Sequence, residues 1–231
     1  DLKKLGGLDI VGTIELAADI DMSNIDMQPI KSLTGSFFGN GYIISNLTIN
    51  KELDSYASET GVALFEKFSG DVKVSDVILE NTNITMTSAK SASVAVFAAE
   101  VPSDGTVEFK NCGIVGGAVK GTYKKSGYSK TIKAGSFLGN VSSSSVDIKN
   151  CFSTINVQYD KTSTEYTNYA GGLIGYIEWT SFNLEQSAVV ADVTAGTSNG
   201  SCGGFVGGII GSQSSFSLKS SFFAGTVTGN K

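Results

Sequence analysis

Histidine is absent from the 231 residues, and proline, cysteine and tryptophan are scarce, with 2, 3 and 1 residues respectively. The absence of histidine excludes a histidine-based catalytic triad and the HExxH zinc motif. Basic residues are also few, with 17 Lys and Arg against 22 Asp and Glu, so we expect no nucleic-acid partner. No apolar run reaches the roughly 18 residues of a transmembrane helix, and no signal peptide is visible at Asp1.

The three cysteines show no CxxC spacing and have no histidine to assist them, so the sequence predicts neither a metal site nor a cofactor. Cys112 and Cys151 follow equivalent positions of a repeated segment described below. If those segments stack directly, the two backbones lie about 4.8 Å apart. A disulfide between them and simple stacking of two small side chains are both compatible with that spacing.

A two-part sequence phrase returns six times along the chain. Its first part reads GSFFGNG at 35–41, VALFEKF at 62–68, VAVFAAE at 94–100, GSFLGNV at 135–141, GGLIGYI at 171–177 and GGFVGGI at 203–209. Its second part reads YIISNLTI at 42–49, VKVSDVIL at 72–79, VEFKNCGI at 107–114, VDIKNCFS at 146–153, FNLEQSAV at 182–189 and FSLKSSFF at 216–223. Such a unit, constant in sequence and variable in length, indicates stacked coils that bury apolar faces against their neighbours.

The second parts alternate apolar and polar residues with a period of two, as in Val107-x-Phe109 and Val146-x-Ile148, which predicts strands. The 28 glycines suit the corners between strands, and the scarcity of proline suits an uninterrupted hydrogen-bond ladder. We therefore predict an all-β chain with a single right-handed parallel β-helix of about six coils over residues 35–231. Residues 1–34 are expected to form N-terminal capping strands.

The phrases GGLIGYI at 171–177 and GGFVGGI at 203–209, with the opening stretch ELAADIDMSNIDMQPIKSLTGSFFGNGYIISNLTI at 15–49, resemble the GLUG-type repeat of bacterial surface proteins. Similar stretches begin the β-helical regions of large adhesin-like proteins and occur beside the catalytic part of immunoglobulin A-cleaving metallopeptidases. The resemblance implies a secreted or surface-exposed β-helix used for adhesion, display or spacing. It carries over no catalytic residues.

Stacking also predicts a column of polar side chains at the end of one strand in each coil. Side chains in such a column can bond to one another and to the backbone of the corner. We expect this structural ladder to contain Asn46, Asp76, Asn111, Asn150, Gln186 and Ser220.

A ligand-binding face is predicted where insertions between phrases would emerge on one side of the solenoid. Tyrosines offer flat faces and hydroxyl groups, and lysines offer positive charge, to a glycan or a protein. The residues are Tyr123, Lys124, Lys125, Tyr128, Lys130, Tyr159, Tyr166 and Tyr169. Solvated loops without a ligand explain the same pattern.

Sequons of the N-x-S/T type occur at Asn46, Asn83, Asn140 and Asn199. The ladder turns Asn46 inward, so glycosylation is considered at Asn83, Asn140 and Asn199, in a source with a suitable secretory route.

These observations predict a non-enzymatic scaffold or adhesin module, secreted or on the cell surface, that is a fragment of a larger repeat protein. Its partners would be a glycan or protein of a host or neighbouring cell, or copies of itself and flanking repeats. A carbohydrate-binding module, a self-assembling fibre component and a polysaccharide-cleaving β-helix remain alternatives. Cleavage would need two suitably placed carboxylates, but Glu66, Glu100 and Glu178 do not share one aligned position.

Overall fold

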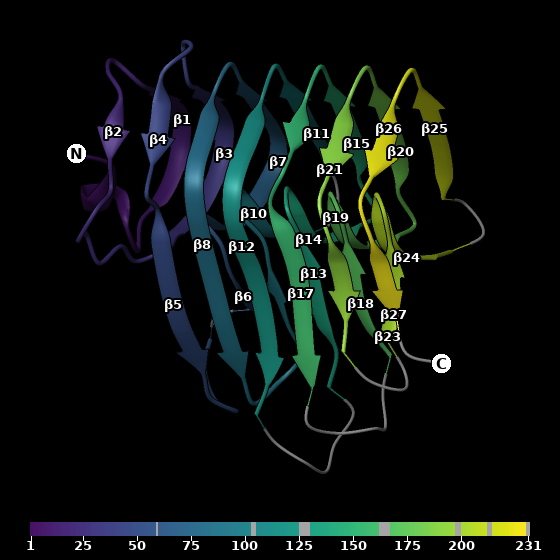
Figure 1. Ribbon diagram of the computed structural model, residues 1–231. Helices are drawn as coiled ribbons and strands as arrows, with labels where there is room; N and C mark the ends of the chain where they lie inside the picture. Colours follow the sequence, from purple (N-terminus) through teal and green to yellow (C-terminus); the bar gives the residue numbers. More distant parts are fainter. Residues whose placement is uncertain are drawn as a thin grey trace.

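The computed structural model describes residues 1–58, 60–102, 105–124, 130–161, 167–196, 200–211 and 214–229. Within these ranges the chain is a parallel β-solenoid in which three sheets, named A, B and C here, run along the stack of coils (Figure 1). A 3-10 helix, η1 (Leu2–Leu5), precedes the first strand. The all-β parallel solenoid predicted from the sequence is confirmed. None of the described helices could cross a membrane, since none is long and apolar enough.

Sheet A contains eleven strands in the described part of the chain. They are β1 (Asp9–Glu15), β3 (Ile30–Phe38), β7 (Phe65–Ser75), β10 (Ala98–Val101), β11 (Thr106–Lys110), β14 (Leu138–Ser142), β15 (Ser145–Lys149), β19 (Ile174–Glu178), β20 (Ser181–Glu185), β24 (Val206–Ile210) and β25 (Ser215–Lys219). The long strands β3 and β7 cover the whole width of this sheet. In later coils the same width is divided between two strands, such as β10 and β11.

Sheet B also contains eleven described strands, and sheet C contains five. Those of sheet B are β2 (Ile20–Asp21), β4 (Ile43–Ser45), β5 (Thr48–Leu53), β8 (Ile78–Ser88), β12 (Gly113–Tyr123), β16 (Phe152–Ser153), β17 (Asn156–Lys161), β21 (Ala188–Val190), β22 (Val193–Ala195), β26 (Phe222–Ala224) and β27 (Val227–Gly229). Those of sheet C are β6 (Gly61–Val62), β9 (Ala92–Val94), β13 (Ile132–Gly135), β18 (Asn168–Gly171) and β23 (Gly200–Gly203).

Each complete coil passes through sheet C, then sheet A, then sheet B. We number the coils from 1 to 6: they are β3–β5, β6–β8, β9–β12, β13–β17, β18–β22 and β23–β27. Coil 1 has no described strand in sheet C, and β1 and β2 precede it as a partial coil. The five strands of sheet C therefore mark five full turns in the described chain, close to the six coils expected.

The core lies between the sheets and consists of like residues stacked in columns. Phe97, Phe109 and Phe137 form one cluster, with ring centroids 5.0–5.1 Å apart. Leu173 joins the same buried core, and Phe205 packs against it in the last coil. The successive first phrases therefore share one interior, as the repeat predicts.

The register of coil 1 differs from the sequence-based alignment. Phe37 pairs with Val74 in sheet A, whereas Ile44 pairs with Leu79 in sheet B. GSFFGNG therefore starts in the position of a second phrase, and the first half of this strand begins at Ile30, which pairs with Phe65. The difference arises because β3 runs unbroken across both halves of sheet A. The expected domain boundary between residues 34 and 35 falls inside this strand, and the capping role of residues 1–34 stays a prediction.

Candidate functional site

A row of side chains follows the bend between sheets C and A and borders a pocket at one end; we call this row the corner groove. It is defined by two in-register columns, one from each sheet. The sheet C column is Gly61, Ser93, Lys133, Tyr169 and Ser201. The sheet A column is Ser32, Lys67, Glu100, Asn140, Tyr176 and Gly208.

Small residues at the bend bring the two columns close together. The residue before each sheet A member is Ala99 in coil 3, Gly139 in coil 4 and Gly175 in coil 5. A Cβ on Gly139 would lie 2.6 Å from the oxygen of Ala99, and a Cβ on Gly175 would lie 2.5 Å from the oxygen of Gly139. Real Cβ atoms do not approach backbone so closely, so glycine is needed for this contact. In coil 2 the same position holds Glu66, whose larger side chain borders the groove instead.

Glu100 is fixed by hydrogen bonds to both of its carboxylate oxygens. Ser93 Oγ donates to Oε1 at 2.6 Å, and Asn140 Nδ2 donates to Oε2 at 2.6 Å. Burial raises the pKa of Glu100, while the two hydrogen bonds and the charge of Lys133 act in the opposite direction. The carboxylate is thus held in a fixed orientation by a seryl hydroxyl beside it and an amide from the next coil.

Lys133 continues this network toward the later coils. Its Nζ donates to Asn140 Oδ1 at 2.9 Å and lies 4.4 Å from the ring centroid of Tyr176. The second contact is a cation–π interaction. Burial lowers the pKa of Lys133, and the charges of Glu100 and Glu178 oppose that change.

Two tyrosines form the part of the groove in coil 5. The rings of Tyr169 and Tyr176 lie 4.6 Å apart with an interplanar angle of 46°. Burial raises the pKa of Tyr176 to about 12, with a further contribution from the charge of Glu178. In coil 6 the Tyr169 ring occupies the place of a side chain on Gly208, because a Cβ there would lie 2.3 Å from Tyr169 Cδ1. The aromatic surface therefore extends from coil 5 onto coil 6.

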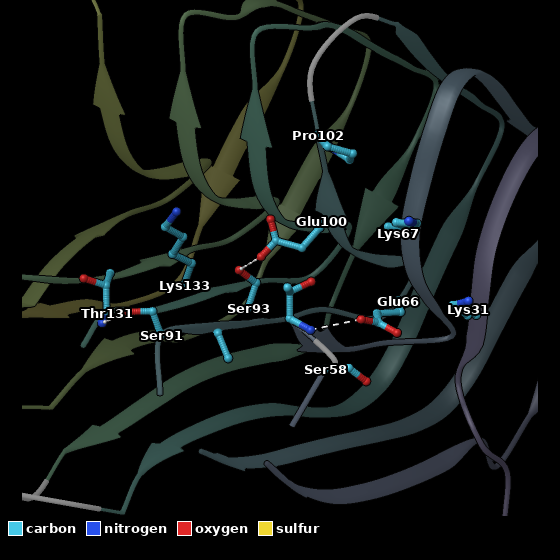
Figure 2. A pocket seen from close by; sticks show the side chains of 12 residues that line it. Lys31, Ser58, Glu66, Lys67, Ser91, Ser93, Glu100, Pro102, Thr131 and Lys133 are labelled. Atoms are coloured by element: carbon cyan, nitrogen blue, oxygen red, sulfur yellow. Dashed lines mark hydrogen bonds between the residues drawn. The ribbon is translucent and has the colours of Figure 1, made fainter. Parts of the chain in front are cut away.

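At the other end, in coils 1 to 4, the groove widens into a pocket of about 480 Å³. Figure 2 shows Glu100 and Lys133 on one side of this pocket and Lys31 and Lys67 on the other. Glu66 also borders it, and its Oε1 accepts a hydrogen bond from the backbone N–H of Thr60 at 2.9 Å. Two carboxylates and three ammonium groups thus meet around one hollow.

The chemistry of the groove is that of a hydrogen-bonding and stacking surface. It offers carboxylate and ammonium groups, held in place by a buried hydroxyl and a buried amide, at one end and tyrosine rings at the other. Among the described residues, no group of three or more His, Cys, Asp or Glu side chains is placed to hold a metal ion. The arrangement favours a polar ligand with some apolar ring surface.

The predicted tyrosine and lysine face is wrong for the two buried tyrosines. Tyr123 is 3% exposed and Tyr159 is 0% exposed, since β12 and β17 continue through them and the strand alternation turns both side chains into the core. Lys124 extends into solvent and pairs with Glu52 across coils. Lys130 is half-buried, and Tyr169 belongs to the corner groove. Lys125, Tyr128 and Tyr166 lie outside the described residues.

The predicted ladder divides into two in the structure. Asp76, Asn111, Asn150, Gln186 and Ser220 all adopt positive φ values between 49° and 55° at one corner. Asn111 Nδ2 donates to Asp76 Oδ1 at 2.8 Å, and Asn150 Nδ2 donates to Asn111 Oδ1 at 3.3 Å.

Asn46 was wrongly placed in that ladder. It stands at another corner, within sheet B, where it accepts a hydrogen bond from Asn81 and donates one to Asp21. The shifted register of coil 1 explains this error, because Asn46 follows a sheet B strand rather than a sheet A strand.

Cys112 and Cys151 are neighbours on coils 3 and 4, and the Cys112 N–H donates to Cys151 Sγ at 3.3 Å. Both are buried free thiols in the structure. The hydrogen bond with Cys151 and burial raise the pKa of the Cys112 thiol. The column of small residues predicted here is therefore present, without a bridge.

Of the three sequons considered, Asn140 is unsuitable for glycosylation. Its side chain is only 9% exposed and both of its amide atoms are bound within the groove. Asn83 is half-buried at the start of a strand segment. Asn199 lies outside the described residues.

The corner groove is not predicted by columns of like residues, because its positions hold different residue types in successive coils. A signal was nevertheless present, because the groove pairs of coils 3 to 5 are each seven residues apart. Ser93 and Glu100, Lys133 and Asn140, and Tyr169 and Tyr176 follow this spacing. The spacing reflects a short sheet C strand, a bend and an outward-facing position in sheet A. Glu66 and Glu100 lie one residue apart in register, and both nevertheless border the same pocket.

No protein-family model matches the chain, and no curated protein matches it. A solved structure with a similar fold is the crystal structure of a protein described as a "putative immunoglobulin A1 protease" from Bacteroides ovatus. The two chains are 17% identical, with a TM-score of 0.50 over 92% of this chain and 68% of the other. At this identity the likeness shows a shared β-helical fold, and activity has to be argued from the site itself. The GLUG-type resemblance stays a prediction.

Proposed function

We propose that this chain is a non-enzymatic β-solenoid module, secreted or on the cell surface, that binds an extended glycan along the corner groove. The observation that carries the proposal is the row of paired polar and aromatic side chains in coils 3 to 5, which continues into the pocket beside Lys67. Each coil contributes about 4.8 Å to the length of this row. A long ligand lying along the solenoid would therefore meet a new pair of side chains at each of coils 3 to 5.

Its hydrogen-bonding groups favour a ligand rich in hydroxyls. The Glu100 carboxylate accepts, the Lys133 ammonium donates, and the side chain of Asn140 holds both in place. Fixed groups of this kind lose little side-chain entropy when a ligand binds. The half-exposed ring of Tyr169 adds a flat surface against which a sugar ring can lie.

An extended peptide suits this groove less well than a glycan. Peptides that add to a sheet need a free strand edge with unpaired N–H and C=O groups. The groove is built from the faces of sheets C and A, whose strands in coils 3 to 5 are paired on both sides. It therefore presents side chains rather than a backbone ladder.

Cleavage of a glycan is a second candidate function, favoured by one observation: Glu66 and Glu100 border the same pocket. Glycosidases use two carboxylates whose environments differ. However, both oxygens of Glu100 already accept hydrogen bonds from neighbouring side chains. This favours a carboxylate that orients a ligand over one that reacts with it.

The proposal is tested by titration calorimetry with a panel of hexasaccharides, both neutral (cellohexaose) and acidic (hexagalacturonate). We expect at least one to bind, and Tyr169→Ala to weaken its binding about tenfold, equivalent to ~1.4 kcal/mol. Tyr56→Ala is the matched control, because Tyr56 is 95% exposed and lies outside the groove. An unchanged affinity of Tyr169→Ala would contradict the groove as the binding site.

The same samples separate binding from cleavage. We expect no release of reducing ends after prolonged incubation with the hexasaccharides. Release that is lost in both Glu66→Gln and Glu100→Gln would assign the second function instead.

A further inference from the structure

The pocket end of the corner groove holds three ammonium groups, and two of them already have partners. Lys31 forms an ion pair with Asp9 at 2.9 Å. Lys133 is bound to Asn140 and lies over the Tyr176 ring. Lys67 makes no hydrogen bond or ion pair with another described residue. Its charge interacts with Asp9, a carboxylate already paired with Lys31.

The nearest in-register carboxylate does not neutralise Lys67. Glu100 is its partner in the next coil, yet Glu100 directs its oxygens to Ser93 and Asn140. Glu66 has one oxygen on the Thr60 N–H, on the sheet C side of the pocket. Lys67 is thus a half-buried cation beside the pocket, and no described residue forms an ion pair with it.

The pocket is also less acidic than the chain as a whole, even when the Asp9 carboxylate on Lys31 is counted. Three ammonium groups face two carboxylates here, whereas the whole chain carries a formal net charge of -5. Local positive charge on an acidic body selects anionic ligands over neutral ones, and less strongly as salt is added.

We propose that the glycan of the corner groove is acidic, and that a carboxylate or sulfate group of one sugar unit pairs with Lys67 Nζ in the pocket. This inference rests on the proposed function. Beyond that function, it specifies that the ligand is negatively charged and that Lys67 selects this charge. The sugar chain then extends from the pocket past Glu100 and Lys133 toward the tyrosine pair.

The test compares acidic hexasaccharides with matched neutral ones. Hexagalacturonate is paired with its methyl ester, and a sulfated carrageenan hexasaccharide with its desulfated form. A hydrogen bond to a charged group is stronger than one between neutral groups, so we expect the acidic form of at least one pair to bind about tenfold more tightly or better. The pair that shows this difference identifies carboxylate or sulfate as the recognised group.

Lys67→Met should abolish that difference while the neutral form binds as before. Lys219→Met is the control, because Lys219 is exposed in the last coil, far along the solenoid from the pocket. Equal affinity for acidic and neutral forms, or an unchanged preference in Lys67→Met, would overturn the inference and leave glycan binding standing. Failure of every hexasaccharide to bind would overturn the proposed function itself.

Discussion

Coils 5 and 6 carry the same apolar side chains at the same positions, but only one of the two coils buries them. Phe182 pairs with Phe216, and Leu184 pairs with Leu218. In coil 5 these side chains are 0% and 1% exposed, and in coil 6 both are 42% exposed. Each inner coil is covered by a neighbour on both sides, whereas coil 6 has a described neighbour on one side only. Burial in this molecule is therefore a property of adjacent coils rather than of one coil.

At the opposite end of the solenoid, several apolar side chains are buried. Leu2 of η1 is buried, together with Leu16, Met22 and Met27. The first strand, β1, also carries two acidic residues, Asp9 and Glu15. Natural sheet edges use such charges to prevent pairing with another chain.

Coil 6 lacks that protection in the part that the structure describes. Its one charged side chain there is Lys219, and Phe222 is 58% exposed. The two ends thus differ both in cover and in charge. Association between copies stays a prediction, and sedimentation of the chain beside Phe222→Lys would examine it at this end.

The largest expected effect comes from placing a charge at the two equivalent leucine positions. Leu184→Lys buries an unpaired ammonium group, so we expect a loss of more than about 4 kcal/mol in the free energy of unfolding. Leu218→Lys keeps its charge in solvent and should cost about 1 kcal/mol or less. Denaturant unfolding of both variants measures the difference, with Leu184→Met as the volume-conserving control. Similar losses in the two lysine variants would show that coil 6 is covered in solution.

A smaller effect is expected at the polar corner ladder. Asn150→Ala removes a hydrogen bond and places alanine at φ 53°, so it should cost about 1–2 kcal/mol. Asn150→Gly also removes the hydrogen bond, but glycine adopts a positive φ without strain, so this variant should lose less stability. Ser220→Ala, in coil 6, replaces one Cβ residue by another at φ 49° and should be nearly neutral. Thermal unfolding ranks the three variants, and a loss in Ser220→Ala equal to that in Asn150→Ala would contradict the ladder's contribution.

The repeat predicted the fold because every coil buries side chains at the same positions and uses the same residue types there. The second phrases Val107-x-Phe109 and Val146-x-Ile148 pair in register as the alignment requires. The alignment failed in coil 1, where the first half of the strand reads Ile30–Leu33 and has no glycine-bracketed phrase to reveal it. Local sequence could not show that β3 runs unbroken across sheet A.

The site was harder to predict than the fold for a physical reason. Core columns repeat one residue type, because each coil must fill the same space. The corner groove places serine, lysine and tyrosine at one position in successive coils, since outward-facing residues are free to vary. The prediction that Tyr123 and Tyr159 lie on the surface was wrong because strands β12 and β17 continue further than the apolar pattern indicated.

The smallest effect concerns the titration of Glu100, whose burial depends on its neighbours in the same way as that of Phe182. Burial raises its pKa in the folded protein above the ordinary 4.5. The folded state then holds the proton more tightly than the unfolded state. The favourable contribution of Glu100 to the free energy of unfolding is therefore complete below its pKa in the unfolded state. This contribution is lost as pH rises through its pKa in the folded state.

Glu100→Gln removes this titration while keeping the possible hydrogen bonds, because the Ser93 hydroxyl can accept as well as donate. The wild type should therefore lose stability relative to Glu100→Gln as pH rises from below 4.5 toward neutrality. Urea midpoints of both proteins across that range measure the difference, with Glu108→Gln, a half-buried strand position paired with Lys73, as the control. A stability difference that does not change with pH would mean that the neighbouring coils leave Glu100 as well solvated as a residue at the open end.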